Sequence, residues 1–139
     1  MRRRLTRLAA LPARERAALL RAWVLFFAVE LALRARQADR LARRLERAAI
    51  VGAPPPDVAR VNDLVELAAR AVPFRATCLT KSLVLGWMLV WLGMPVRLRF
   101  GVKRRAGGLH AHAWLESNGA PIAGLDAGDG YTPLREVAR

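Results

Sequence analysis

An almost wholly apolar run at residues 79–92 constrains the fold of this chain more than any other segment. Its apolar side chains would cover nearly the whole circumference of a helix, and a helix of that kind has to be buried. Gly93 fits the position just after such a helix, and Pro95 prevents the helix from continuing. We therefore expect a central buried helix, with the rest of the chain packed around it.

Two helices are expected before this run, in the N-terminal third of the chain. A long helix is indicated from Arg14, and residues 37–50 continue as a helix rich in Arg, Ala and Leu. We interpret the pair as a helical hairpin that covers the core and keeps a basic face in solvent. The first helix carries apolar side chains at helical spacing, which we expect to face the core: Leu19, Trp23, Phe26, Phe27 and Leu31.

A third helix is indicated after residues 52–56, which form the clearest helix breaker in the chain. Asp57 can cap this helix, and Pro73 follows its end. Its apolar residues form a single stripe, which predicts one buried face: Val58, Val61, Leu64, Val65, Ala68 and Val72.

The hydrophobic period changes from that of a helix to that of a strand after the apolar run. Residues 96–103 alternate between apolar and mostly polar side chains, which is typical of a half-buried strand. A glycine-containing turn leads to a second strand at residues 109–116. A tight-turn sequence then leads to a third strand at residues 120–125. Helices followed by a small antiparallel sheet define the α+β fold class.

Length and composition fit one compact unit. The chain has 139 residues, and 54% of them are hydrophobic, which is sufficient for a single core. We expect a helical N-terminal region at residues 1–52, packed on a core formed by residues 53–139. The single cysteine excludes an intramolecular disulfide. The sequence shows no convincing signal peptide and no apolar span of about 20 residues, so we expect a soluble cytoplasmic protein.

The charge of the chain is strongly positive and is concentrated near the N-terminus. The net charge is +13, and residues 1–49 hold 13 Arg and 4 acidic residues, which gives +9 for that region. Such a balance favours acidic partners. We expect the arginine-rich helices of residues 14–50 to dock a partner rather than to anchor the chain in a membrane.

Cys78 and the only two histidines of the chain are the candidate catalytic residues. Cys78 starts the apolar helix, where unpaired backbone N–H groups and the helix dipole favour thiolate over thiol. His110 and His112 are two residues apart in a strand, so both side chains emerge on the same face. An imidazole beside the sulfur would activate it as a nucleophile, and Asp126 or Asp129 could orient that imidazole.

Two other interpretations of these residues remain open. His110 and His112 have the spacing of two zinc ligands on a strand, with Cys78 or Asp126 as a third, which would make a zinc-dependent hydrolase. Alternatively, Cys78 is a buried and inert side chain, and the chain is a small basic module that binds a protein or peptide.

Several segments around these residues resemble the lasso-peptide leader peptidases, which belong to the transglutaminase-like (papain-like) superfamily of cysteine proteases. The segments are residues 78–85, 92–98, 100–102 and 109–116. The resemblance extends from about residue 61 to residue 134. The chain length is similar to that of the stand-alone peptidase half of the split biosynthesis protein.

The resemblance implies a cytoplasmic cysteine protease that removes the leader from a ribosomally made precursor peptide, with no cofactor and no metal. A separate leader-binding protein would deliver the precursor, and an ATP-dependent macrolactam synthetase would then close the ring. The resemblance matches Cys78 to the nucleophile and His112 to the catalytic histidine. It assigns the acidic third member to Asp126, and it gives His110 no role.

Overall fold

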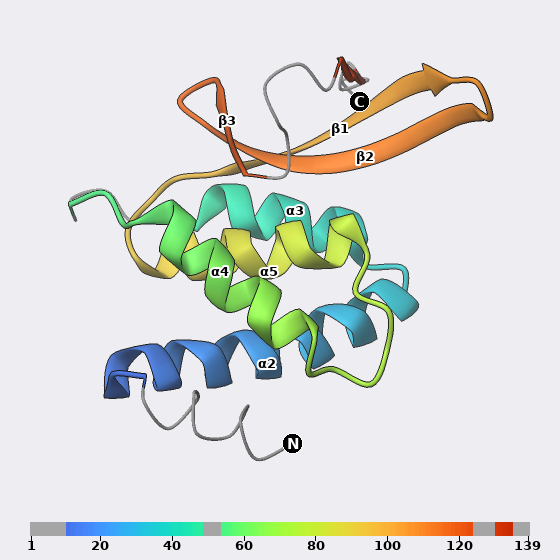
Figure 1. The fold of residues 1–139 in the computed structure, drawn as a ribbon. Helices are drawn as coiled ribbons and strands as arrows, with labels where there is room; N and C mark the ends of the chain where they lie inside the picture. Colours follow the sequence, from blue (N-terminus) through green and yellow to red (C-terminus); the bar gives the residue numbers. More distant parts are fainter. Residues whose placement is uncertain (1–10, 49–53, 124–129, 135–139) are drawn as a thin grey trace.

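A computed structural model describes residues 11–48, 54–123 and 130–134 of the chain. A group of helices lies on one side of the molecule and an antiparallel sheet on the other, as Figure 1 shows. The expected α+β class is therefore confirmed. Among the described residues, no helix has both the length and the apolar character needed to cross a bilayer.

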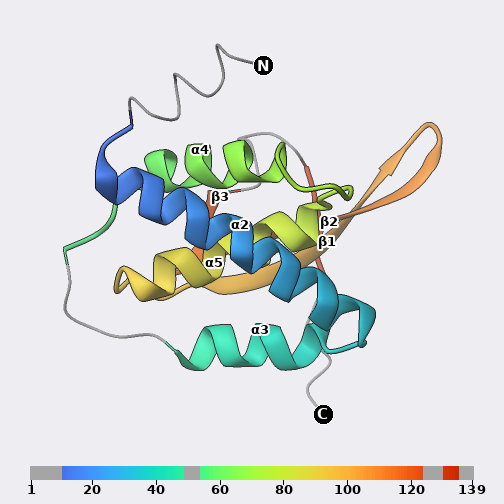
Figure 2. The ribbon, with the colours of Figure 1, turned by 90° about the horizontal axis from the view of Figure 1, so that it is seen from below.

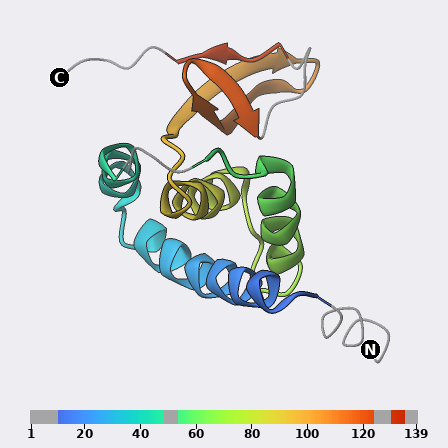
Figure 3. The same cartoon turned by 90° about the vertical axis from the view of Figure 1, so that its left-hand side faces the viewer.

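The described helices enclose one central helix. In chain order they are α2 (Ala13–Arg34), α3 (Ala38–Arg47), α4 (Val58–Ala69) and α5 (Cys78–Trp91). Figure 3 shows α5 in the centre, with α2, α3 and α4 around it and the sheet on its remaining side. The helix stops where the sequence indicates, because Gly93 adopts the left-handed φ of 87° that the position after a helix favours.

The sheet has four described strands, in the spatial order β3-β2-β1-β4. They are β1 (Arg97–Arg105), β2 (Gly108–Ser117), β3 (Ala120–Ala123) and β4 (Thr132–Pro133). The first two strands form a long hairpin whose tip extends beyond the helices in Figures 1 and 2. The two-residue strand β4 was not expected, because a segment so short carries no periodic pattern.

The tight turn between β2 and β3 lies where the sequence predicts it. Asn118 and Gly119 have φ angles of 51° and 80°, and two successive positive φ angles are what a two-residue hairpin turn requires. These two residue types adopt such angles most easily, which is why the turn could be read from the sequence.

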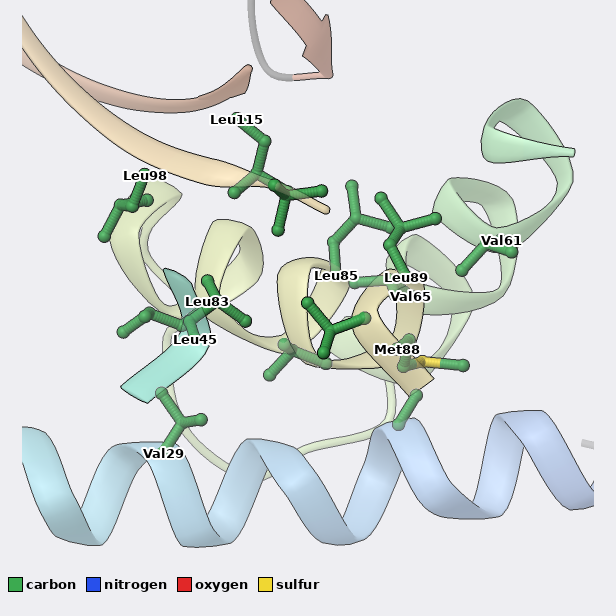
Figure 4. Close-up of a cluster of buried hydrophobic side chains, with 14 of the residues drawn as sticks. Val29, Leu45, Val61, Val65, Leu83, Leu85, Met88, Leu89, Leu98 and Leu115 are labelled. Carbon is green, nitrogen blue, oxygen red and sulfur yellow. The ribbon is translucent and has the colours of Figure 1, made fainter. Parts of the chain in front are cut away.

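Side chains from every layer meet at α5. Figure 4 shows Val29 of α2, Leu45 of α3 and Val65 of α4 on the helical side, and Leu98 and Leu115 of the first two strands on the other side. All five are at most 5% exposed. Helices from before and after residue 52 therefore share one core with the sheet.

The core-facing side of α2 differs in part from the expectation. Phe26 is buried as predicted, but Trp23, Phe27 and Leu31 are exposed, and the prediction for them is wrong. The buried residues of this helix are Ala22, Phe26 and Val29. Apolar side chains occupy two faces of α2, so periodicity alone does not decide which face packs on the core.

The expected cap and buried face of α4 are confirmed. The Asp57 carboxylate accepts a hydrogen bond of 3.0 Å from the Arg60 backbone N–H, which satisfies one unpaired donor of the first turn. Four members of the expected stripe are buried, namely Val61, Leu64, Val65 and Ala68. Val58 and Val72 are half-buried, and Val72 lies after the end of the helix.

Candidate active site at the start of α5

Cys78 is the first residue of α5, and its side chain is exposed. The preceding Thr77 caps the helix, because its hydroxyl accepts a hydrogen bond of 3.2 Å from the Thr80 backbone N–H. The two threonine hydroxyls are also 2.9 Å apart, and Thr80 is almost fully buried. This arrangement fixes where the helix begins, so the thiol lies at the end of the helix where backbone N–H groups have no helical partner.

A hydrogen bond between α5 and β2 sets the alignment of the helix and the strand. The Ser82 hydroxyl, one turn after Cys78, donates to the Ala113 carbonyl oxygen at 3.2 Å. One turn further along, Leu115 Cδ2 lies 3.4 Å from where a Cβ at Gly86 would be. The helix and the strand therefore run in the same direction, one helical turn for every two strand residues.

This alignment can be extended back to the cysteine. Four helical residues advance about 6 Å and two strand residues about 6.7 Å, so the two elements stay in step over a short distance. One step before Ser82 and Ala113 lie Cys78 and Ala111. Ala111 stands between His110 and His112, so the same step leads from the start of α5 toward the segment of β2 that holds both histidines; Cys78 and Ala111 are both exposed to solvent.

The imidazole of His112 emerges on the sheet face opposite to the buried Ala113, since successive side chains of a strand alternate. His112 is half-buried and His110 is exposed. The His112 ring lies 5.1 Å from the ring of Tyr131, and the two planes are tilted by 32°. Asp126 and Asp129, the candidates for the acidic member, lie outside the described residues.

Trp114 shares this outer face with His112 and is nevertheless only 1% exposed. Its indole N–H donates to one oxygen of the Glu116 carboxylate at 3.1 Å, and Arg99 Nε donates to the other oxygen at 3.0 Å. Glu116 is thus held between two donors, and the strand that carries His112 is fixed on both of its faces.

Sequence reasoning missed Gly101 and Tyr131 as neighbours of the histidine. Gly101 is paired with His112 across the β1–β2 hairpin, and the Tyr131 ring also lies 5.3 Å from Lys103 Nζ. A glycine inside a strand often marks a close approach of another group, and that signal was present in the sequence. Nothing comparable pointed to Tyr131.

Potential metal ligands do not cluster in the described part of the chain. Cys78, His110 and His112 are all described, and no three His, Cys, Asp or Glu side chains within residues 11–48, 54–123 and 130–134 are arranged to hold a metal ion. Asp126, the other proposed third ligand, lies outside the described residues.

The fold and the site together define a small α+β domain with a cysteine at the start of its central helix and histidines on the adjoining strand. The family model described as "Transglutaminase-like superfamily" matches residues 21–136, so the chain belongs to that superfamily. The match includes most of α2 as well as the sheet. Neither the search of curated proteins nor the search of solved structures gave a match.

Proposed function

We propose that this protein is a cysteine peptidase in which Cys78 is the nucleophile, His112 the general base and Asp126 the group that orients the imidazole. Its superfamily generally uses a Cys-His-Asp site for peptide cleavage or acyl transfer. The observation that carries the proposal is the hydrogen bond from Ser82 to Ala113, because Cys78 lies one helical turn before Ser82 and His112 lies next to Ala113 in β2.

The proposed reaction has two stages. His112 accepts the thiol proton while Cys78 Sγ attacks the carbonyl carbon of the peptide bond, and the Cys78 backbone N–H donates to the oxyanion. The C–N bond then breaks, the imidazolium gives its proton to the departing amine, and a thioester remains. Water, deprotonated by His112, attacks the thioester, which releases the carboxylate product and restores the thiol.

The substrate proposed is a ribosomally made lasso precursor peptide, from which the leader is removed in the cytoplasm before a macrolactam synthetase closes the ring. A leader-binding protein would deliver this precursor. Support comes from the residues around the site, because the sequences at 78–85 and 109–116 resemble those of the leader peptidases.

The test is incubation of the protein with a candidate precursor and its leader-binding protein, with products read by mass spectrometry. We expect cleavage at one position, with incorporation of water into the new carboxylate. Incorporation of an amine in place of water would identify an acyltransferase and contradict the peptidase.

Variants assign the roles within this assay. Cys78→Ala should abolish cleavage and leave the helical circular-dichroism signal intact. His112→Ala should lower turnover on the order of a hundredfold or more, and His110→Ala should lower it less. Iodoacetamide should inactivate the enzyme, and a chelator should not. Activity that survives in the Cys78→Ala variant, or that needs zinc, would contradict the proposal.

A further inference from the structure

The helix α2 is apolar on two opposite faces, and the described residues cover only one of them. Ala22, Phe26 and Val29 pack in the core. The other face carries an exposed row of apolar side chains at successive turns of the helix, which we call the α2 stripe: Leu20, Trp23, Val24, Phe27 and Leu31. Between Ala22 and Leu33 only Glu30 is charged, and a segment that is apolar on most sides belongs in an interior. In Figure 3, however, α2 is the outermost helix, on the side away from the sheet.

The side chains of the α2 stripe are exposed enough to form a binding surface. Leu20, Val24 and Leu31 are 62%, 56% and 70% exposed. Single exposed apolar residues are normal on a protein surface, but a contiguous row marks an interaction site. The helix therefore has the composition of one that lies between two layers, and residues 11–48, 54–123 and 130–134 provide one of them.

The aromatic members of the stripe are held in place by one another. The rings of Trp23 and Phe27 meet edge-to-face at 4.7 Å, and Phe27 meets Phe74 in the same way at 5.4 Å. Ordered aromatic side chains of this kind lose little entropy on binding and are common anchors of protein interfaces. Rings in fixed positions can enter shaped pockets on a protein, and a fluid lipid surface has no such pockets, so the stacking favours a protein as the occupant.

Charge limits which protein can bind. Arg16 lies one turn before Leu20, and Arg34, whose Nε also donates to Glu30 at 3.0 Å, lies three residues after Leu31. Arginines therefore stand at both ends of the stripe, about 27 Å apart along the helix. The chain as a whole carries a net charge of +13. A second copy of the chain would bring the same charges to the contact and be repelled, whereas a partner with acidic residues would be attracted.

The stripe is also continuous with the candidate active site. Phe74, which packs on Phe27, lies in the segment between α4 and α5, four residues before Cys78. A protein seated on α2 would therefore reach the segment that leads into the nucleophile.

We propose that the α2 stripe is the docking site for the protein that delivers the precursor peptide. The partner would present an apolar face, with acidic residues placed to meet the arginines at the two ends. The identity of the partner rests on the proposed function, but the docking surface itself does not depend on catalysis.

Introduction of a charge into the stripe tests the proposal. Val24→Glu and Leu31→Glu alter well-exposed side chains, so both variants should keep the fold and the thermal midpoint of the wild type. We expect each to weaken binding of the leader-binding protein, measured by isothermal titration calorimetry, by about tenfold or more. Leu92→Glu is the matched control, because it makes the same change at an exposed leucine after α5, and its affinity should equal that of the wild type.

The assay separates this proposal from the proposed function. Binding is measured with the Cys78→Ala variant as well, which cannot cleave and should bind as tightly as the wild type. If the wild-type protein does not cleave the precursor, but Leu31→Glu still weakens partner binding, the docking site stands and the peptidase proposal fails. Iodoacetamide should label Cys78 equally fast in the wild type and in both stripe variants.

Three results would overturn the docking proposal. The first is equal partner affinity in the wild type, Val24→Glu and Leu31→Glu. The second is binding to phosphatidylglycerol vesicles that Leu31→Glu abolishes, with partner affinity unchanged, which would make a membrane the occupant. The third is a dimer in sedimentation experiments that Leu31→Glu dissociates, which would make a second copy of the chain the occupant.

Discussion

The indole of Trp114 occupies the space that a side chain at Gly101 would need. A Cβ added to Gly101 would lie 2.6 Å from both Cη2 and Cζ3 of Trp114, and 2.8 Å from the Thr132 carbonyl oxygen. The absence of a side chain at this position of β1 thus lets both the tryptophan of β2 and the backbone of β4 approach β1 closely. Because Gly101 is also paired with His112, this close approach sits beside the proposed base.

Replacement of Gly101 by alanine should therefore destabilise the sheet. Overpacking of a filled site costs about 1–3 kcal/mol, and here the obstructing atoms belong to a buried ring and to the backbone. Urea unfolding followed by circular dichroism would measure the loss. The matched control is Gly107→Ala at the hairpin turn, where an added Cβ meets nothing within 4 Å, and it should leave stability almost unchanged. Equal stability of the two variants would refute this explanation of Gly101.

Glu116 is expected to stabilise the fold, because its carboxylate accepts hydrogen bonds from two side chains at once. Glu116→Ala leaves the Trp114 indole N–H and the Arg99 guanidinium without this acceptor, and a buried unsatisfied donor costs about 1–3 kcal/mol. Glu116→Gln keeps an amide oxygen and should lose less. The midpoint of thermal unfolding measures both, and a glutamine variant as unstable as the alanine variant would contradict the hydrogen-bond account.

The contact between α2 and α4 should make the free energy of unfolding depend on pH. The Arg60 guanidinium donates to the Glu15 carboxylate, with Nε at 2.8 Å, and this hydrogen bond holds the pKa of Glu15 below its usual range. Because the pKa of Glu15 is lower in the folded state than in the unfolded state, the ionised carboxylate stabilises the fold. This stabilisation is fully present above the unfolded pKa of about 4.3 and is lost as the pH falls through the folded pKa.

Comparison with Glu15→Gln isolates that contribution. At pH 7 the wild type should have the higher thermal midpoint, and the difference should shrink as the pH falls below about 4. The effect should be small and should weaken in salt, because the pair is exposed to solvent. A difference that is the same at pH 7 and at pH 3 would show that the charge of Glu15 is not its source.

Tyr131 is expected to restrict the orientation of the His112 imidazole. The rings are 5.1 Å apart, so removal of the tyrosine ring frees one side of the imidazole. Tyr131→Ala should lower kcat by roughly tenfold, the size expected when a general base is poorly oriented, with little change in KM. Tyr131→Phe keeps the ring and should restore kcat. A phenylalanine variant as slow as the alanine variant would assign the effect to the hydroxyl group instead.

Much of the fold could be read from the sequence because its signals are local. The run at residues 79–92 is apolar around nearly its whole circumference, so its favourable place is the interior. Asp57 caps α4, and Asn118 and Gly119 form the β2–β3 turn, because these residue types match the backbone geometry required at those positions. The position of Cys78 at the start of the central helix follows from the same local signals.

The tertiary structure alone decided which surfaces meet. Both faces of α2 are apolar, so the sequence could not show that Phe26 packs inside while Leu31 stays exposed. Tyr131 is 19 residues from His112 in the chain, and only the pairing of β4 with β1 brings the two rings together. Local propensity and periodicity determine elements, whereas contacts between distant segments depend on how those elements pack, and no pattern within either segment encodes that.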